Sequence, residues 1–287
     1  MTLGALLQLT RIPNVFTAMA NVAAGVVLVR KGGFEPPDVL LLAASAAFYA
    51  SGMVFNDFFD REVDARERPS RPIPSGAVSP RAAAALGAVL LAVGSGLAAL
   101  VSLRSLVVAS GLAAAILIYD AWVKGTALGP VVMGSCRLLN VGLGLSAAPA
   151  PWRPYVWAPL AAGLYTAALT FVARDEVLGT PRRRGQMFVA FMAGLGALLL
   201  VFVWLAPSPP AALPFALIVL VGGYRLFAPL WQETTGPRIG RAVGGGILMM
   251  PALDATFVAG FGHPLAALAV LAFALPAYVL RRRFAMT

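Results

Sequence analysis

Long apolar segments separated by short polar links dominate this chain. A membrane-spanning helix needs roughly 20 consecutive apolar residues, and ten segments approach that length. Most are too uniformly apolar to show a 3.6-residue stripe, as expected for helices that face lipid and one another. The predicted spans cover about residues 13–30, 38–57, 82–102, 105–123, 127–148, 155–173, 187–206, 211–230, 242–260 and 264–280.

Composition supports this interpretation. The 287 residues are 60% hydrophobic and 12% charged, with a mean hydropathy of +0.83, whereas soluble domains are about half apolar and a quarter charged. We therefore predict one all-α, polytopic membrane domain over residues 1–287. The N-terminal residues do not resemble a cleaved signal peptide, so the first apolar segment is expected to remain as a span. The single cysteine, Cys136, excludes an internal disulfide.

The basic residues lie at the ends of the apolar segments, although the net charge of +10 alone would fit nucleic acid. This placement indicates membrane topology and contact with lipid headgroups, not nucleic-acid binding. With the N-terminus inside, most arginines fall in the cytoplasmic links. The opposite side holds only Arg30, Lys31, Arg104 and Arg153. The positive-inside rule thus predicts a cytoplasmic N-terminus, and we expect the protein in a bacterial inner membrane.

The link after the second span carries the clearest chemistry. Asp57, Asp60 and Asp64 stand at i, i+3 and i+7, so a helix places them on one face. Such like charges repel, and Mg²⁺ removes the conflict because it binds one or two carboxylates together with water and phosphate oxygens. Arg68 and Arg71 follow in a proline-rich stretch, and guanidinium groups suit phosphate. The pattern indicates a lipid diphosphate site more than a solvated loop whose Asp and Arg residues simply pair.

This stretch resembles the first aspartate-rich motif of the UbiA superfamily of intramembrane prenyltransferases. It reads Asn-Asp-x-x-Asp-x-x-x-Asp from Asn56 to Asp64, then Arg-Pro-x-Arg-Pro-Ile-Pro-Ser-Gly from Arg68 to Gly76. The resemblance implies nine core helices around a central cavity open to the cytoplasmic side, with the tenth span as an addition. It also implies that Asn56, Asp57, Asp60 and Asp64 bind Mg²⁺ and diphosphate, and that Arg68 and Arg71 assist with the phosphates.

Two later segments extend the predicted site. Lys124 follows the fourth span, where a cation of the family contacts the diphosphate; a topology anchor, or a local i, i+4 pair with Asp120, is the alternative. Arg137 and Asn140 lie one turn apart inside the fifth span, where a charge is costly and indicates function by default. Their segment is similar to one in the EboC-like branch of the family. We expect both side chains to face the central cavity and to bind acceptor or diphosphate.

The link after the sixth span departs from the family pattern of two carboxylates four residues apart. Aligned on Gly179, the second position is Asp175, but the first is Phe171. Glu176 follows directly and can contribute a carboxylate to the site only if the helix ends early. The resemblance implies that Asp175 and Glu176 are metal ligands, whereas an acidic helix end among topology arginines is the alternative.

Polar and aromatic residues elsewhere are less specific. Asp254 within the ninth span fits a hydrogen-bonded interior carboxyl as well as a catalytic one. Arg11 and Asn14 at the start of the first span either line the cavity or anchor the chain at the interface. We expect some aromatic rings to line the prenyl channel and shield a carbocation. The candidates are Phe16, Phe48, Phe55, Phe58, Phe59 and Trp122.

These features predict Mg²⁺-dependent transfer of a prenyl group from an isoprenoid diphosphate to an aromatic or other nucleophilic acceptor within the membrane. Mg²⁺ and basic groups would stabilise the charge that develops on the leaving diphosphate. The predicted catalytic residues are Asp57, Asp60, Asp64 and Asp175. Two alternatives stay open: a UbiA-type membrane terpene cyclase that acts on the diphosphate alone, and a carrier that binds an isoprenoid without turnover.

Overall fold

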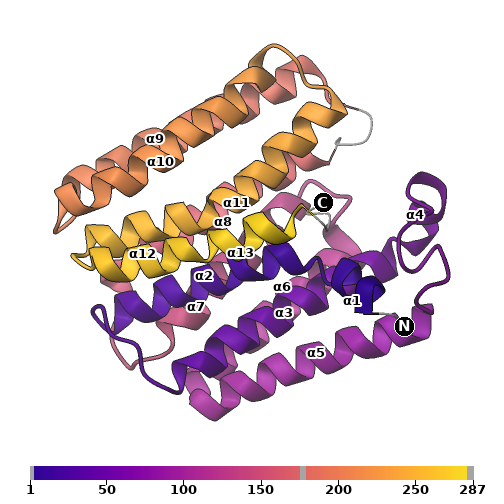
Figure 1. The fold of residues 1–287 in the computed structure, drawn as a ribbon, viewed down its shortest axis with the longest axis horizontal. Helices are drawn as coiled ribbons and strands as arrows, with labels where there is room; N and C mark the ends of the chain where they lie inside the picture. The colour runs from indigo at the N-terminus through magenta and orange to yellow at the C-terminus, as the bar shows by residue number, and fades with distance from the viewer. Residues whose placement is uncertain (1–2, 175–178, 283–287) are drawn as a thin grey trace.

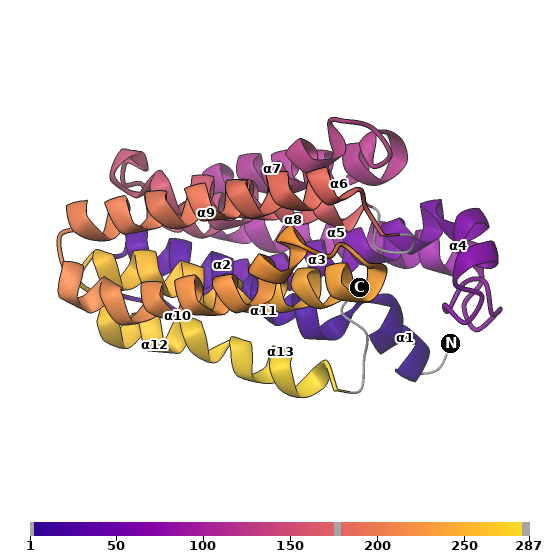
Figure 2. The same cartoon turned by 90° about the horizontal axis from the view of Figure 1, so that it is seen from above.

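The computed structural model describes residues 3–174 and 179–282, and within them every regular element is helical. The longer helices run along roughly one direction (Figures 1 and 2). In chain order the elements are α1 (Leu3–Leu9), α2 (Ile12–Val29), α3 (Asp38–Phe59), α4 (Arg61–Glu67), α5 (Pro80–Val101), α6 (Leu103–Ile118), the π-helical turn η1 (Tyr119–Val123), α7 (Gly129–Leu145), the 3-10 turn η2 (Arg153–Tyr155), α8 (Trp157–Ala173), α9 (Arg182–Leu205), α10 (Pro209–Phe227), the 3-10 turn η3 (Ala228–Trp231), α11 (Gly236–Gly260), α12 (Pro264–Ala272) and α13 (Ala274–Leu280).

The predicted apolar segments all form helices. Seven helices in the described residues are long and apolar enough to cross a membrane: α2, α3, α5, α6 with η1, α9, α10 with η3, and α11. Helices α7 and α8 have 17 residues each and correspond to the fifth and sixth predicted segments. The predicted all-α, polytopic bundle is therefore confirmed.

The tenth predicted segment forms one apolar helical stretch, Pro264–Leu280, with a one-residue break at Phe273 that separates α12 from α13. Pro276 explains the break: it has no N–H to donate to the carbonyl of Ala272, and its ring crowds that carbonyl. Both pieces pack on α2 and α11, as seen in Figure 1, where they lie over α2.

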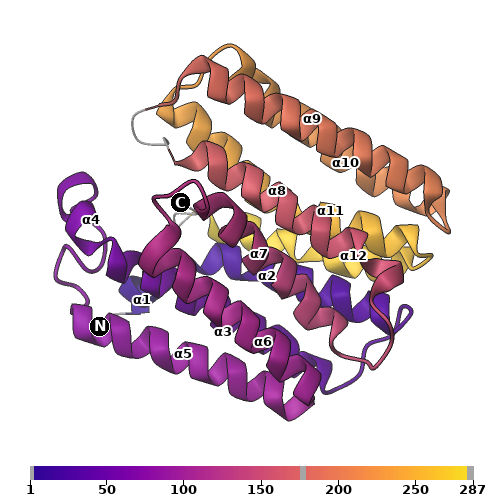
Figure 3. The same ribbon diagram turned by 180° about the vertical axis from the view of Figure 1, so that it is seen from behind.

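Helix α2 lies at the centre of the bundle. In α2, 83% of the apolar stretch is buried, against 17% in α5 at the edge. Figure 3 shows α5 and the α9–α10 pair at opposite edges of the bundle. Close approach of α2 to α7 depends on glycine, since a Cβ on Gly144 would lie 2.9 Å from the Cα of Gly25. Such small residues let membrane helices pack backbone against backbone.

The other small residues of the apolar segments differ in role. Cβ atoms on Gly87 and Gly94 would meet the rings of Phe55 and Phe48 at 3.0 and 3.1 Å, so these two rings pack between α3 and α5. A Cβ on Gly96 would meet nothing within 4 Å, so this glycine is not at a helix contact.

Candidate functional site

A cavity of about 970 Å³ is lined by the start of α2, the end of α3, α4, η1, the first half of α7, the second half of α8, the start of α9 and the middle of α11. Its wall combines acidic and basic side chains with apolar ones. The polar and charged lining residues are Arg11, Asn14, Tyr49, Asn56, Asp60, Asp64, Glu67, Arg68, Arg71, Tyr119, Asp120, Lys124, Arg137, Thr166, Thr170, Arg174 and Arg184. The fold therefore brings together most of the residues that the sequence pointed to, and we call this space the charged cavity.

The acidic motif keeps the predicted helical register across the joint between α3 and α4. The backbone N–H of Asp60 donates to the Asn56 carbonyl at 3.0 Å, and that of Asp64 donates to the Asp60 carbonyl at 2.8 Å. The local i to i+4 geometry thus continues through the joint, so the three aspartates lie along one side of the chain.

Asp57 and Asp64 converge on one guanidinium group. Arg71 Nη1 lies 2.7 Å from Asp64 Oδ2 and 3.2 Å from Asp57 Oδ1, and both carboxylates are buried, with 4% and 3% exposure. Arg11 Nη2 adds a second contact to Asp57 at 3.1 Å. The turn after α4 makes this possible, because the Arg71 N–H donates to the Arg68 carbonyl at 3.0 Å and folds Arg71 back over the motif.

Asp60 turns to a different partner, since its carboxylate forms an ion pair with Lys124 Nζ. The alternative account of Lys124, a local ion pair with Asp120, is therefore not what the structure shows. Asp120 instead accepts a hydrogen bond of 3.1 Å from Asn56 Nδ2. The π-helical turn η1 contains Asp120 and ends at Val123, directly before Lys124. Such turns are frequent at functional sites.

The donor set fits a cation that shares its shell with a ligand. In the described part of the chain, no three acidic, histidine or cysteine side chains are arranged to hold a metal by themselves. The expected cluster of all three motif aspartates is therefore not formed, because Asp60 pairs with Lys124. Asp57 and Asp64, however, meet at one nitrogen atom of Arg71. Mg²⁺ needs only one or two protein carboxylates, with phosphate oxygens and water completing its shell.

The second predicted acidic site is only partly within the described residues. Asp175 and Glu176 lie outside them, so their expected role as metal ligands stays a prediction. On either side, Arg174 and Arg184 line the charged cavity. The guanidinium carbon of Arg184 lies 5.7 Å from the ring centre of Phe171, the residue at the position of the usual first carboxylate.

Arg137 reaches the charged cavity from deep within α7. Its Nη1 donates to Asn21 Oδ1 at 2.8 Å and its Nη2 to Thr17 Oγ1 at 3.2 Å, and it lies over the Tyr49 ring at 5.2 Å. Asn21 belongs to no recognised motif, so it was not selected from the sequence. A polar amide inside an apolar span is, however, a sequence feature that could have marked it as a candidate.

Asn140 does not line the charged cavity. It borders a smaller space of about 70 Å³ that shares Arg137 and Tyr49 with the charged cavity. Its amide donates to the Ala18 carbonyl at 2.8 Å and accepts from Ser45 Oγ at 2.9 Å. Asn140 therefore joins α7 to α2 and α3, and its expected contact with a ligand stays a prediction.

The less specific candidates also differ in whether they line the charged cavity. Arg11 and Asn14 line the charged cavity, as one of the two alternatives expected. Among the aromatic candidates, Phe59 and Trp122 line it as well. Asp254 accepts a hydrogen bond of 2.6 Å from Asn21 Nδ2, which supports the interior hydrogen-bonded carboxyl.

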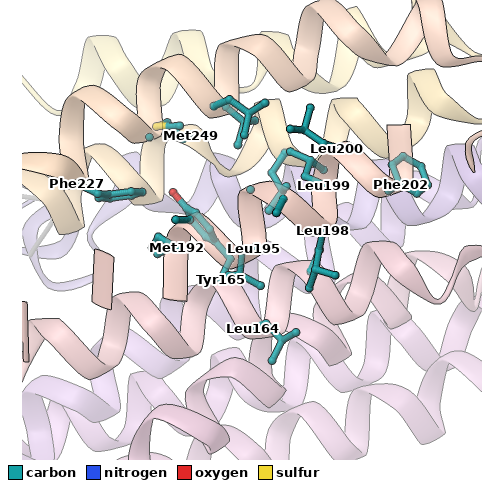
Figure 4. Close-up of a pocket in the computed structure, with 18 of the residues that line it drawn as sticks. Leu164, Tyr165, Met192, Leu195, Leu198, Leu199, Leu200, Phe202, Phe227 and Met249 are labelled. Carbon is teal, nitrogen blue, oxygen red and sulfur yellow. The ribbon is translucent and has the colours of Figure 1, made fainter. Parts of the chain in front are cut away.

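A second cavity, of about 440 Å³, lies between α8, α9, α10 and α11 (Figure 4). Leucine, methionine and phenylalanine side chains form its wall, including Met192, Phe227 and Met249. The hydroxyl of Tyr165 is already used, since it donates to the Gly246 carbonyl at 2.9 Å. This cavity offers contacts for hydrocarbon but no charged group.

An all-α bundle of apolar helices around a charged cavity defines a multi-pass membrane protein. The UbiA prenyltransferase family matches residues 18–232, and the chain belongs to this family. The digeranylgeranylglyceryl phosphate synthase of Methanopyrus kandleri is 38% identical over 153 residues, which cover 52% of this chain and 56% of that protein. The synthase of the same name from Halobacterium salinarum is 32% identical over 222 residues, or 76% and 80% of the two chains. The chain thus matches little more than half the length of the first of these relatives.

Solved structures agree on the fold. A UbiA homologue from Archaeoglobus fulgidus, described as bound to GPP and Mg²⁺, matches with a TM-score of 0.67 at 17% identity, over 93% of this chain and 99% of that one. A structure of digeranylgeranylglyceryl phosphate synthase in membranes gives a TM-score of 0.64 at 22% identity, over 90% and 97%. At these identities the likeness establishes the UbiA-like fold alone.

Proposed function

We propose that this protein transfers a prenyl group from an isoprenoid diphosphate to a nucleophilic acceptor within the membrane, with Mg²⁺ as cofactor. The observation that carries the proposal is the pair of buried carboxylates, Asp57 and Asp64, joined by Arg71. Asp64 and Arg71 line the charged cavity, and Asp57 is not among its lining residues. The names of the relatives favour an alcohol acceptor of the prenylated glyceryl phosphate type over an aromatic one. Membership of the family supports the donor class.

Basic residues around the cavity would hold the diphosphate. Arg68, Arg71 and Lys124 line the cavity close to the acidic motif, where guanidinium and ammonium groups can donate to phosphate oxygens. Asp57 and Asp64, with Asp60 nearby, are the carboxylates that would hold the metal. When bound, Mg²⁺ would neutralise charge that develops on the leaving diphosphate.

Apolar wall residues would keep water away from the reacting carbon. Phe59, Val63, Leu169 and Met250 all line the charged cavity. In the transfer, the C1–O bond of the donor breaks with its electron pair on the diphosphate, and a lone pair of the acceptor oxygen forms the new bond to C1. The O–H proton of the acceptor then passes to the released diphosphate. An apolar, preorganised site suits this step because water would otherwise capture the carbocation.

Purified protein incubated with Mg²⁺ and geranylgeranyl diphosphate tests the proposal. Diphosphate released only when an acceptor is present supports a transferase. Release without an acceptor, with a cyclic hydrocarbon product, would identify a terpene cyclase, and binding without release would identify a carrier.

Two substitutions test the metal-site assignment. We expect Asp57→Asn and Asp60→Asn each to abolish turnover while the protein stays folded in detergent, because an amide cannot supply the negative charge that a cation requires. Glu62→Gln is the matched control, since Glu62 lies in α4 two residues after Asp60 and its side chain is 83% exposed. Full activity in both aspartate variants would remove Asp57 and Asp60 from the site.

A further inference from the structure

A chain of three buried polar residues joins three helices beside the charged cavity. Asp254 of α11 accepts a hydrogen bond of 2.6 Å from Asn21 of α2. Asn21 in turn accepts one of 2.8 Å from Arg137 of α7. Their exposed fractions are 1%, 1% and 8%, and of the three only Arg137 lines the cavity. Charged groups at this depth are costly, so each requires a physical reason.

The chemistry of the three side chains fixes the direction of the chain. An ionised carboxylate only accepts hydrogen bonds and a guanidinium only donates them. Asn21 must therefore present its NH₂ to Asp254 and its carbonyl oxygen to Arg137, which is the arrangement observed. Asp254 thus sets the orientation of the Asn21 amide, and the amide sets the position of the Arg137 guanidinium.

Arg137 differs in its pairing from the arginines of the acidic motif. Arg11 and Arg71 form direct ion pairs with carboxylates. In the described residues Arg137 forms none, and its two hydrogen-bond partners, Asn21 and Thr17, are neutral. A guanidinium carries five N–H groups, so those not used by these partners stay available on the cavity wall.

We propose that Asp254 and Asn21 are positioning residues that hold Arg137 as a receptor for a phosphate-type anion of one substrate. The inference rests on the proposed function and adds to it an anion contact away from the acidic motif. When ionised, Asp254 offsets the cost of burying the cation. Because Asn21 separates the two charges, Asp254 achieves this without occupying the N–H groups of Arg137. The anion belongs either to the diphosphate of the donor or to the phosphate of the acceptor.

An exchange of the two side chains separates positioning from a purely structural role. The double variant Asn21→Asp with Asp254→Asn keeps the shapes, the net charge and the possibility of both hydrogen bonds of the chain. It differs in that a carboxylate now lies directly on Arg137 and competes with the substrate anion. A purely structural role needs only these two hydrogen bonds and the charge balance, so it predicts that the double variant behaves like the native protein.

We expect the double variant to unfold at nearly the native temperature in detergent. Hydrogen bonds to charged groups are worth about 1.5–3 kcal/mol, so we expect KM for one substrate to rise roughly tenfold or more, with a smaller change in kcat. Measuring KM separately for geranylgeranyl diphosphate and for the acceptor identifies which anion Arg137 binds. Calorimetric titration with geranylgeranyl diphosphate and with a prenylated glyceryl phosphate gives the same comparison without turnover.

Ser51→Ala is the matched control, because it removes a buried hydrogen bond of 2.8 Å between α3 and the Gly87 carbonyl of α5 and does not involve Arg137. Its KM and Kd values are expected to stay native. Asn21→Asp alone is a second test, since it also places a carboxylate on Arg137 and is expected to weaken binding of the same substrate.

Two failures are distinguishable. Native protein that neither binds nor converts these substrates refutes the proposed function and this inference together. Native protein that turns over, with exchange and Asn21→Asp variants that match its KM and Kd for both substrates, refutes the inference alone.

Discussion

Substitution of Arg71 by glutamine tests the metal site through stability instead of activity. Arg71 Nη1 contacts both Asp57 and Asp64, and the three side chains have exposed fractions of 12%, 5% and 5%. Arg71→Gln leaves two buried carboxylates close together, with only Arg11 in contact with Asp57. Removing one partner of a buried ion pair costs about 3–5 kcal/mol. We take the lower end, about 3 kcal/mol, because Arg11 remains.

This loss is expected without divalent cations. For a chain of this size one kcal/mol corresponds to roughly 2–4 °C, so Tm in EDTA is expected to fall by about 6–12 °C. Mg²⁺ that binds between the two carboxylates would replace the missing cation. At a concentration of 100 times its Kd it would restore about 2.7 kcal/mol, which is most of the loss.

Thermal unfolding in detergent, followed by intrinsic fluorescence with EDTA and with Mg²⁺, measures both effects. Arg61→Gln is the matched control, because Arg61 lies 3.5 Å from the exposed side chain of Glu62. Exposed pairs of this kind contribute about 0–1 kcal/mol. If Arg71→Gln is as stable as Arg61→Gln in EDTA, or gains nothing from Mg²⁺, the proposed convergence of Asp57 and Asp64 on a metal is wrong.

Two further predictions concern the second ion pair and the helix contacts. Lys124→Met removes the partner of Asp60 at the cavity and is expected to lower kcat/KM by roughly 10²-fold. Little change in Tm is expected, because the Lys124 side chain is 31% exposed. Native turnover would contradict the role of this cation. Gly144→Ala is expected to destabilise the bundle by about 1–3 kcal/mol, because its Cβ would press on the backbone of α2. Gly96→Ala, where nothing lies within 4 Å, is expected to leave Tm native or raise it slightly. Equal melting temperatures for both alanine variants would argue against the close contact of α2 with α7.

The acidic motif shows which features of the site could be predicted from local sequence. The spacing of Asp57, Asp60 and Asp64 predicted a helical register, and the backbone hydrogen bonds across the joint of α3 and α4 confirm it. The partners of these aspartates did not follow from spacing. Lys124 stands four residues after Asp120 in the chain, yet it pairs with Asp60, 64 residues away.

The sequence by itself determined the membrane class, the positions of the helices and the place of the acidic motif. Apolar length and side-chain spacing are local properties, and a helix in lipid satisfies its backbone hydrogen bonds within its own segment. Only the tertiary structure decided that Arg71 joins two aspartates, and that Asn21 connects Asp254 to Arg137 across 233 and 116 residues of chain. Such contacts depend on which faces of separate helices meet and how closely their backbones approach, and uniformly apolar spans carry little pattern from which to predict either.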